Sequence, residues 1–148
     1  MTAEFKLSLL ECDRSDPLAD FFDARAAITL RGVSHETAFV VAGRDLQAFA
    51  TDLGRLAPGA DASALLLGGW DAERCLRLQV THAGRSDAAV ARVWMDSDGP
   101  ADSLRSNVET EFVVPFAALM RFSMDIHQLV EQRTLGDVTL TAEADGNE

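Results

Sequence analysis

Hydrophobic and polar residues alternate along several short segments of the chain. In residues 3–12, Phe5, Leu7 and Leu9 are apolar and the residues between them are polar. A period of two places successive side chains on opposite faces of a strand, so this pattern predicts a half-buried strand. The same alternation predicts strands at residues 25–33, 35–43, 75–84, 86–96 and 106–114, and an apolar run predicts a short strand before Gly68-Gly69.

Two further segments carry apolar residues at the spacing of a helix. An amphipathic helix near residues 44–57 is predicted from the stripe Leu46, Phe49, Leu53 and Leu56. Gly54 interrupts this helix and is expected to mark close packing against the sheet. A second helix is predicted near residues 115–132, where Pro115 suits the first turn and is followed by the stripe Phe116, Leu119, Phe122, Ile126, Leu129 and Val130. The last segment, residues 137–148, predicts one short edge strand.

The order of the predicted elements indicates the fold class. Helices interrupt runs of hairpins instead of alternating with every strand, which favours an antiparallel α+β fold over a parallel doubly wound one. We therefore predict one domain over residues 1–142, a mainly antiparallel sheet of hairpins and meanders with two amphipathic helices. Residues 143–148 are predicted to form a mobile acidic tail. The pattern of residues along the chain shows no internal repeat.

Composition and charge narrow the classes of partner. The 148 residues include 13 basic and 24 acidic side chains, a net charge of −11. Nucleic acid and anionic membranes both attract basic surfaces, so neither is an expected partner. The N-terminus lacks the pattern of a signal peptide, so a cytoplasmic location is expected. Cys12 and Cys75 are expected to be reduced, although a single disulfide between them stays open.

The residues that commonly carry chemistry are scattered. His35 and His82 fall in predicted turns and His127 in the second predicted helix, without the spacing of a metal site. We expect no catalytic residue, no metal site and no cofactor. Trp70 and Trp94 are expected in the core. A strand would direct Glu109 and Glu111 to one face, for which solvent exposure is the favoured interpretation over acid–base chemistry.

Acidic residues gather in two places. The segment 11–24 contains one arginine, Arg14, among five carboxylates, and residues 137–148 contain four carboxylates and no base. The candidate partner-binding residues are the first group: Glu11, Asp13, Asp16, Asp20 and Asp23. A loop presents such side chains without disturbing a core, so substitution by asparagine is expected to leave stability unchanged. A merely solvated loop is the alternative.

A succession of short motifs resembles the WapI-type immunity proteins and their uncharacterised bacterial relatives. It spans residues 36–130 and contains F-x-x-D-L-x-x-L from Phe49 to Leu56, the turn Gly69-Trp70, L-x-L-x-V from Leu76 to Val80, A-V-A-R-V, E-F-V-V-P, and a helix with L-x-x-F. The resemblance implies a small cytoplasmic protein without catalysis that protects a bacterium by binding a toxin domain. It supplies no contact residues.

Three hypotheses for the function follow. The first is a non-enzymatic binding protein, an immunity-type inhibitor whose acidic surface neutralises a basic toxin domain. The second is a small ligand-binding or enzymatic domain with a site between the sheet and the helices. The third is an assembly subunit that uses an exposed strand edge.

Overall fold

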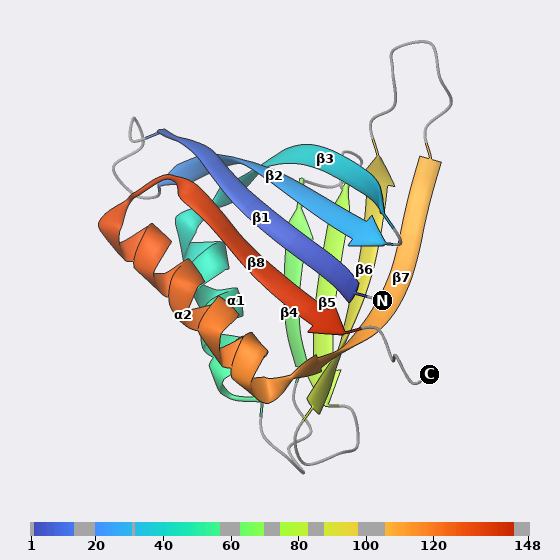
Figure 1. Cartoon of the computed structure of the whole chain (residues 1–148). Helices are drawn as coiled ribbons and strands as arrows, with labels where there is room; N and C mark the ends of the chain where they lie inside the picture. Colours follow the sequence, from blue (N-terminus) through green and yellow to red (C-terminus); the bar gives the residue numbers. More distant parts are fainter. Residues whose placement is uncertain are drawn as a thin grey trace.

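The computed structural model describes residues 2–13, 20–30, 32–56, 63–69, 75–82, 88–97 and 106–143. These residues form eight strands and two helices (Figure 1). In chain order the elements are β1 (Thr2–Asp13), β2 (Phe21–Leu30), β3 (Val33–Ala42), α1 (Gly43–Gly54), β4 (Ser63–Gly68), β5 (Leu76–His82), β6 (Ala88–Ser97), β7 (Ser106–Pro115), α2 (Phe116–Gln132) and β8 (Gly136–Glu143).

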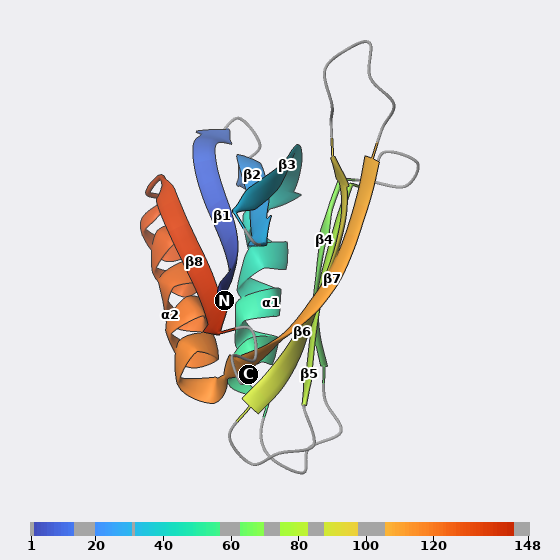
Figure 2. The same ribbon diagram turned by 45° about the vertical axis from the view of Figure 1, so that its right-hand side comes forward.

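The strands form two four-stranded sheets whose described pairs are all antiparallel. Sheet A has the order β3-β2-β1-β8 and sheet B the order β4-β5-β6-β7. The two helices pack against each other, and each also contacts strands, α1 on β4 and α2 on β8. In Figure 2 the helices lie on the side of sheet B that faces sheet A. The expected α+β class with antiparallel strands is confirmed, as are both helices and the edge strand near the C-terminus.

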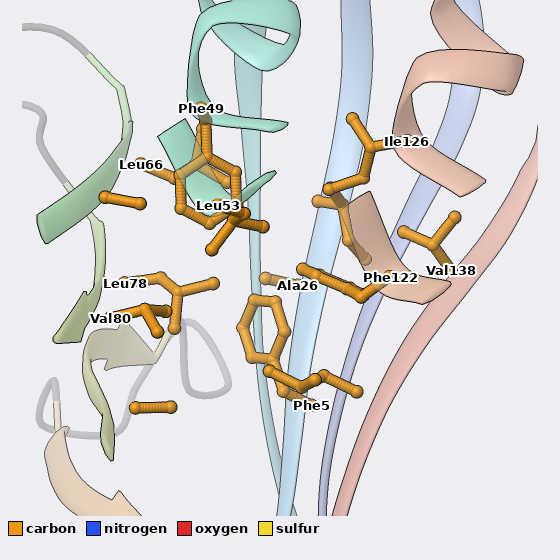
Figure 3. Close-up of a cluster of buried hydrophobic side chains, with 14 of the residues drawn as sticks. Phe5, Ala26, Phe49, Leu53, Leu66, Leu78, Val80, Phe122, Ile126 and Val138 are labelled. Atoms are coloured by element: carbon orange, nitrogen blue, oxygen red, sulfur yellow. The ribbon is translucent and has the colours of Figure 1, made fainter. Parts of the chain in front are cut away.

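The core lies between the two sheets and the helices (Figure 3). Alternate residues of the strands point into it, and the helices add one apolar stripe each, which removes these side chains from water. Its largest fully buried side chains come from both sheets and both helices: Phe5, Phe22, Phe49, Phe122, Leu7, Ile28, Leu46, Leu53, Leu66, Leu76, Leu78 and Met95.

The fold consists of two units with the same order of elements. The N-terminal unit (Thr2–Gly68) runs β-β-β-α-β, and the C-terminal unit (Leu76–Glu143) repeats this order. Each unit contributes three strands to one sheet and its last strand to the other, because β8 pairs with β1 and β4 pairs with β5. The prediction of a chain without an internal repeat is therefore wrong.

Residue identities support the equivalence of the two units. Glu36-Thr37 and the run Phe39-Val40-Val41 recur, at one constant spacing, as Glu109-Thr110 and the run Phe112-Val113-Val114. The registers agree as well, since Phe39 pairs with Ala24 in sheet A and Phe112 pairs with Ala91 in sheet B. The first two strands of each unit share the pattern of burial but few identical residues, which hides the repeat from inspection of the sequence.

Several local predictions need correction. Gly54 is exposed, and among the described residues no atom outside its own helical turn lies within 4 Å of the position that a Cβ would take, so it does not mark close packing. Asp23 lies in β2 instead of a loop. Glu143 of the predicted tail is the last residue of β8 and pairs with Thr2, whereas residues 144–148 lie outside the described residues.

Candidate functional site

An irregularity in β1 determines which side chains reach the outer face of sheet A. Leu9 pairs with Ala24 and Glu11 pairs with Asp23, so Leu10 is an extra residue in β1. Unbroken alternation from Leu9 would turn Glu11 into the core. The bulge instead leaves Leu10 (50% exposed) and Glu11 outside, and it turns Cys12 toward the core.

The bulge brings two carboxylates of the predicted site together. Glu11 and Asp23 are directly opposite each other on neighbouring strands, and both are exposed. Like charges at directly opposed positions of a sheet destabilise it. Arg25 is the next outward-facing residue of β2, and its Nη1 atom lies 3.6 Å from Oε1 of Glu36. We call Leu10, Glu11 and Asp23 the acidic patch.

The other predicted carboxylates either have another place in the structure or fall outside the described side chains. Asp13 is the last residue of β1 and pairs with Phe21 in the register, but its side chain is not described. Asp16 lies outside the described residues. Asp137 of the C-terminal acidic group is exposed on β8, where it pairs with Ser8.

Asp20 has a structural role at the ends of the two helices. Its carbonyl oxygen accepts a hydrogen bond of 2.7 Å from the main-chain N–H of Gly43, the first residue of α1. Its carboxylate Oδ2 accepts one of 2.7 Å from Nε of Arg133, the C-cap of α2. The expectation that substitution of Asp20 leaves stability unchanged is therefore revised.

An open depression of about 380 Å³ lies beside these contacts. Its lining includes Asp20, Arg44, Gln47 and Arg133. The interior between the sheets and the helices, where the second hypothesis places a ligand, is filled by core side chains such as Phe5 and Phe122, whose rings meet edge to face (Figure 3).

The histidines and cysteines are distributed over separate elements. His35 and His82 belong to strands β3 and β5, contrary to the prediction of turns, and His127 lies on α2. Cys12 and Cys75 are not joined by a disulfide, and Cys75 Sγ lies 3.6 Å from the carbonyl oxygen of Ala38. Within the described ranges, no group of three or more His, Cys, Asp or Glu side chains could hold a metal ion.

The prediction that Trp94 lies in the core is wrong. Val93 and Met95 point into the core, so Trp94 between them lies half-buried on the outer face of sheet B. Trp70 lies outside the described residues. Glu109 and Glu111 share this outer face, as predicted, and Glu111 Oε2 accepts a hydrogen bond of 2.6 Å from Arg92 Nε. The alternation of residues 88–95, which groups Trp94 with Arg92, was the signal for this placement.

No protein-family model matches the chain, and no curated protein sequence matches it. The resemblance to the WapI-type immunity proteins therefore stays a prediction. Among the described helices, neither is long and apolar enough to cross a membrane.

Proposed function

We propose that this protein is a non-catalytic binding protein that holds a basic partner protein against the acidic patch of sheet A. The observation that carries the proposal is the direct opposition of Glu11 and Asp23 on β1 and β2, both exposed to solvent. This arrangement costs stability, and the bulge at Leu10 is what creates it. A positively charged partner would convert the local repulsion into attraction.

The charge of the whole chain suits this function. With a net charge of −11 the protein attracts a basic surface over long range, which raises the rate of association. Leu10 adds an exposed apolar side chain beside the two carboxylates, so the patch offers a contact that salt does not screen. A toxin domain that cleaves nucleic acid has such a basic surface. The finer proposal, an immunity-type inhibitor in a bacterial cytoplasm, draws its support from this complementarity and from the sequence resemblance.

The proposal is tested by isolating the partner and measuring its association. The tagged chain is expressed in its native host, and proteins that bind it are identified by mass spectrometry. The association rate of the identified protein is then compared for the wild type and the Glu11→Gln/Asp23→Asn variant. We expect the variant to associate several-fold more slowly at low salt and to approach the wild type at high salt, because salt screens exposed charges.

A matched control removes two charges elsewhere. Asp45→Asn/Glu131→Gln changes exposed carboxylates on α1 and α2 and alters the net charge equally. The control should retain most of the association rate. Equal losses in the two variants would show that only the net charge matters, and capture of acidic partners alone would contradict the proposal.

A further inference from the structure

The equivalence of the two units allows their outer faces to be compared position by position. One row across sheet B consists of Leu67, Arg77, Trp94 and Glu109. The equivalent row across sheet A consists of Thr139, Lys6, Ala27 and Glu36. The two charged positions carry the same signs in both rows. The fold thus tolerates threonine and alanine where sheet B has leucine and tryptophan.

Neighbouring rows show the same difference. Leu65 of β4 (46% exposed) takes the position that Asp137 has in sheet A, and Val90 of β6 takes that of Asp23. Val113 of β7, opposite Val90, is also 46% exposed. In Figure 2 both helices lie on the other side of sheet B from this face. The face therefore combines exposed apolar side chains with arginines and a tryptophan, the residue types enriched at protein interfaces.

We infer that the outer face of sheet B binds the same face of a second copy of this chain, around a twofold axis parallel to the strands. Arg77 on β5 and Trp94 on β6 are directly opposite each other, on the two sides of the midline of the four-stranded sheet. The twofold axis runs parallel to this midline, in the plane between the two sheets. It places Trp94 of each copy over Arg77 of the other. The contact is self-complementary, as a twofold interface requires.

The charges along the row fit this arrangement. The axis places β7, which carries Glu109, over β4 and beside β5 of the second copy, so that Glu109 approaches Arg77 across the interface. The guanidinium of Arg77 then lies over the indole ring of Trp94 of the other copy, which is a favourable cation–π geometry. Two sheets that pack face to face do so about 10 Å apart, which long side chains span from both sides. Leu65 and Leu67 lie on β4 at one edge of the sheet. They meet β7 of the second copy, which carries Val113 at the opposite edge.

This inference does not rest on the proposed function, because the acidic patch lies on sheet A and stays exposed in such a dimer. The experiment measures the mass of the full chain by sedimentation equilibrium over a hundredfold range of concentration. We expect a reversible monomer–dimer equilibrium for the wild type. Arg77→Glu and Glu109→Arg, each alone, should weaken dimerisation at least tenfold, since each places like charges together across the interface.

Two further variants test whether the dimer forms through this face of sheet B. The double variant Arg77→Glu/Glu109→Arg restores opposite charges and should recover dimerisation. Lys6→Glu makes the same reversal at the equivalent position of sheet A and should dimerise like the wild type. Circular dichroism of each variant confirms that it is folded. A wild type that stays monomeric throughout, a Lys6→Glu variant as impaired as Arg77→Glu, or a double variant without recovery would overturn the inference.

Discussion

Ser123 on α2 donates its hydroxyl hydrogen to the carbonyl oxygen of Ala50 on α1 at 2.7 Å, and these two residues hold equivalent positions in the two units. When a residue contacts the equivalent residue of the other unit, both lie beside the rotation axis that relates the two units. Both residues are small and buried, which lets the two helices approach closely at this point. The hydrogen bond is therefore a junction between the two halves of the fold.

Loss of this junction should weaken the fold. Ser123→Ala removes a buried hydrogen bond, and we expect the free energy of unfolding to fall by about 1 kcal/mol. The double variant Ala50→Ser/Ser123→Ala moves the hydroxyl to the equivalent position and should regain at least half of that loss. Urea denaturation measures both values. A double variant less stable than Ser123→Ala would show that the helix contact is not symmetric.

Substitution of two aspartates of the predicted acidic site should change the stability of the fold in opposite directions. Asp20→Ala removes the carboxylate that accepts a hydrogen bond from Arg133 at the end of α2 and keeps the main-chain bond to Gly43, and we expect a loss of about 1 kcal/mol. Asp23→Ala removes a charge that opposes Glu11, and we expect a gain of about 0.2–1 kcal/mol. Thermal denaturation at low salt checks both. Equal losses in the two variants would contradict the assignment of Asp20 to the helix ends.

Two glycines offer a matched pair of substitutions. A Cβ at Gly68 would lie 2.8 Å from Cδ2 of Phe39 and 3.0 Å from Cβ of Leu76, so Gly68→Ala should cost about 1–3 kcal/mol. In Gly54→Ala the new methyl group, on an exposed helical position, meets no atom of another described element within 4 Å, and the variant should gain about 0.5–1 kcal/mol. Chemical denaturation distinguishes the two, and a neutral Gly68→Ala would mean that the Phe39 ring moves aside freely.

A buried hydroxyl provides a further test. Thr37 is 2% exposed, and its Oγ1 atom has no hydrogen-bond partner among the described residues. Thr37→Val keeps the shape and removes this unsatisfied group, so we expect the free energy of unfolding to rise by about 1 kcal/mol. Thr110, the equivalent residue of β7, is half-buried, and Thr110→Val should change stability less. A destabilised Thr37→Val would indicate that the hydroxyl is hydrated or bonded.

The pairing of the first and last strands predicts that the chain tolerates circular permutation. Thr2 pairs with Glu143, so a short glycine-rich linker can join the ends, and a new start at Cys75 with a new end at Arg74 places the C-terminal unit first. We expect the circular dichroism spectrum and the denaturant m-value of the wild type. A control opened between Phe39 and Val40, inside β3, should not fold.

Periodicity was sufficient for the elements but not for their arrangement. The stripe from Leu46 to Leu56 and the alternation around Phe5 depend on neighbours in the sequence, so helix and strand could be predicted. Nothing in Val138 or Leu140 specifies that their partners are Leu7 and Phe5, because that pairing joins the two ends of the chain. Strand order follows from long-range packing, which a local pattern does not contain.

The candidate site was predicted in part for the same reason. The concentration of carboxylates is visible in the sequence. The direct opposition of Glu11 and Asp23, however, depends on the bulge at Leu10. The hydrogen bond from Arg133 to Asp20 joins residues that are far apart in the chain. The usual burial of tryptophan predicts a core position for Trp94, which is wrong. Its alternation with Val93 and Met95 was the better guide.

The exchange of last strands between the units has a consequence for synthesis on the ribosome. Strands leave the ribosome in chain order, so β1, β2 and β3 emerge early while β8, the edge partner of β1, emerges after the other described strands. Until then the inner edge of β1 presents main-chain groups that can pair with another nascent chain. The N-terminal unit therefore cannot complete its sheet until β8 has been synthesised, and the nascent chain has the greatest need of chaperone protection before that strand emerges.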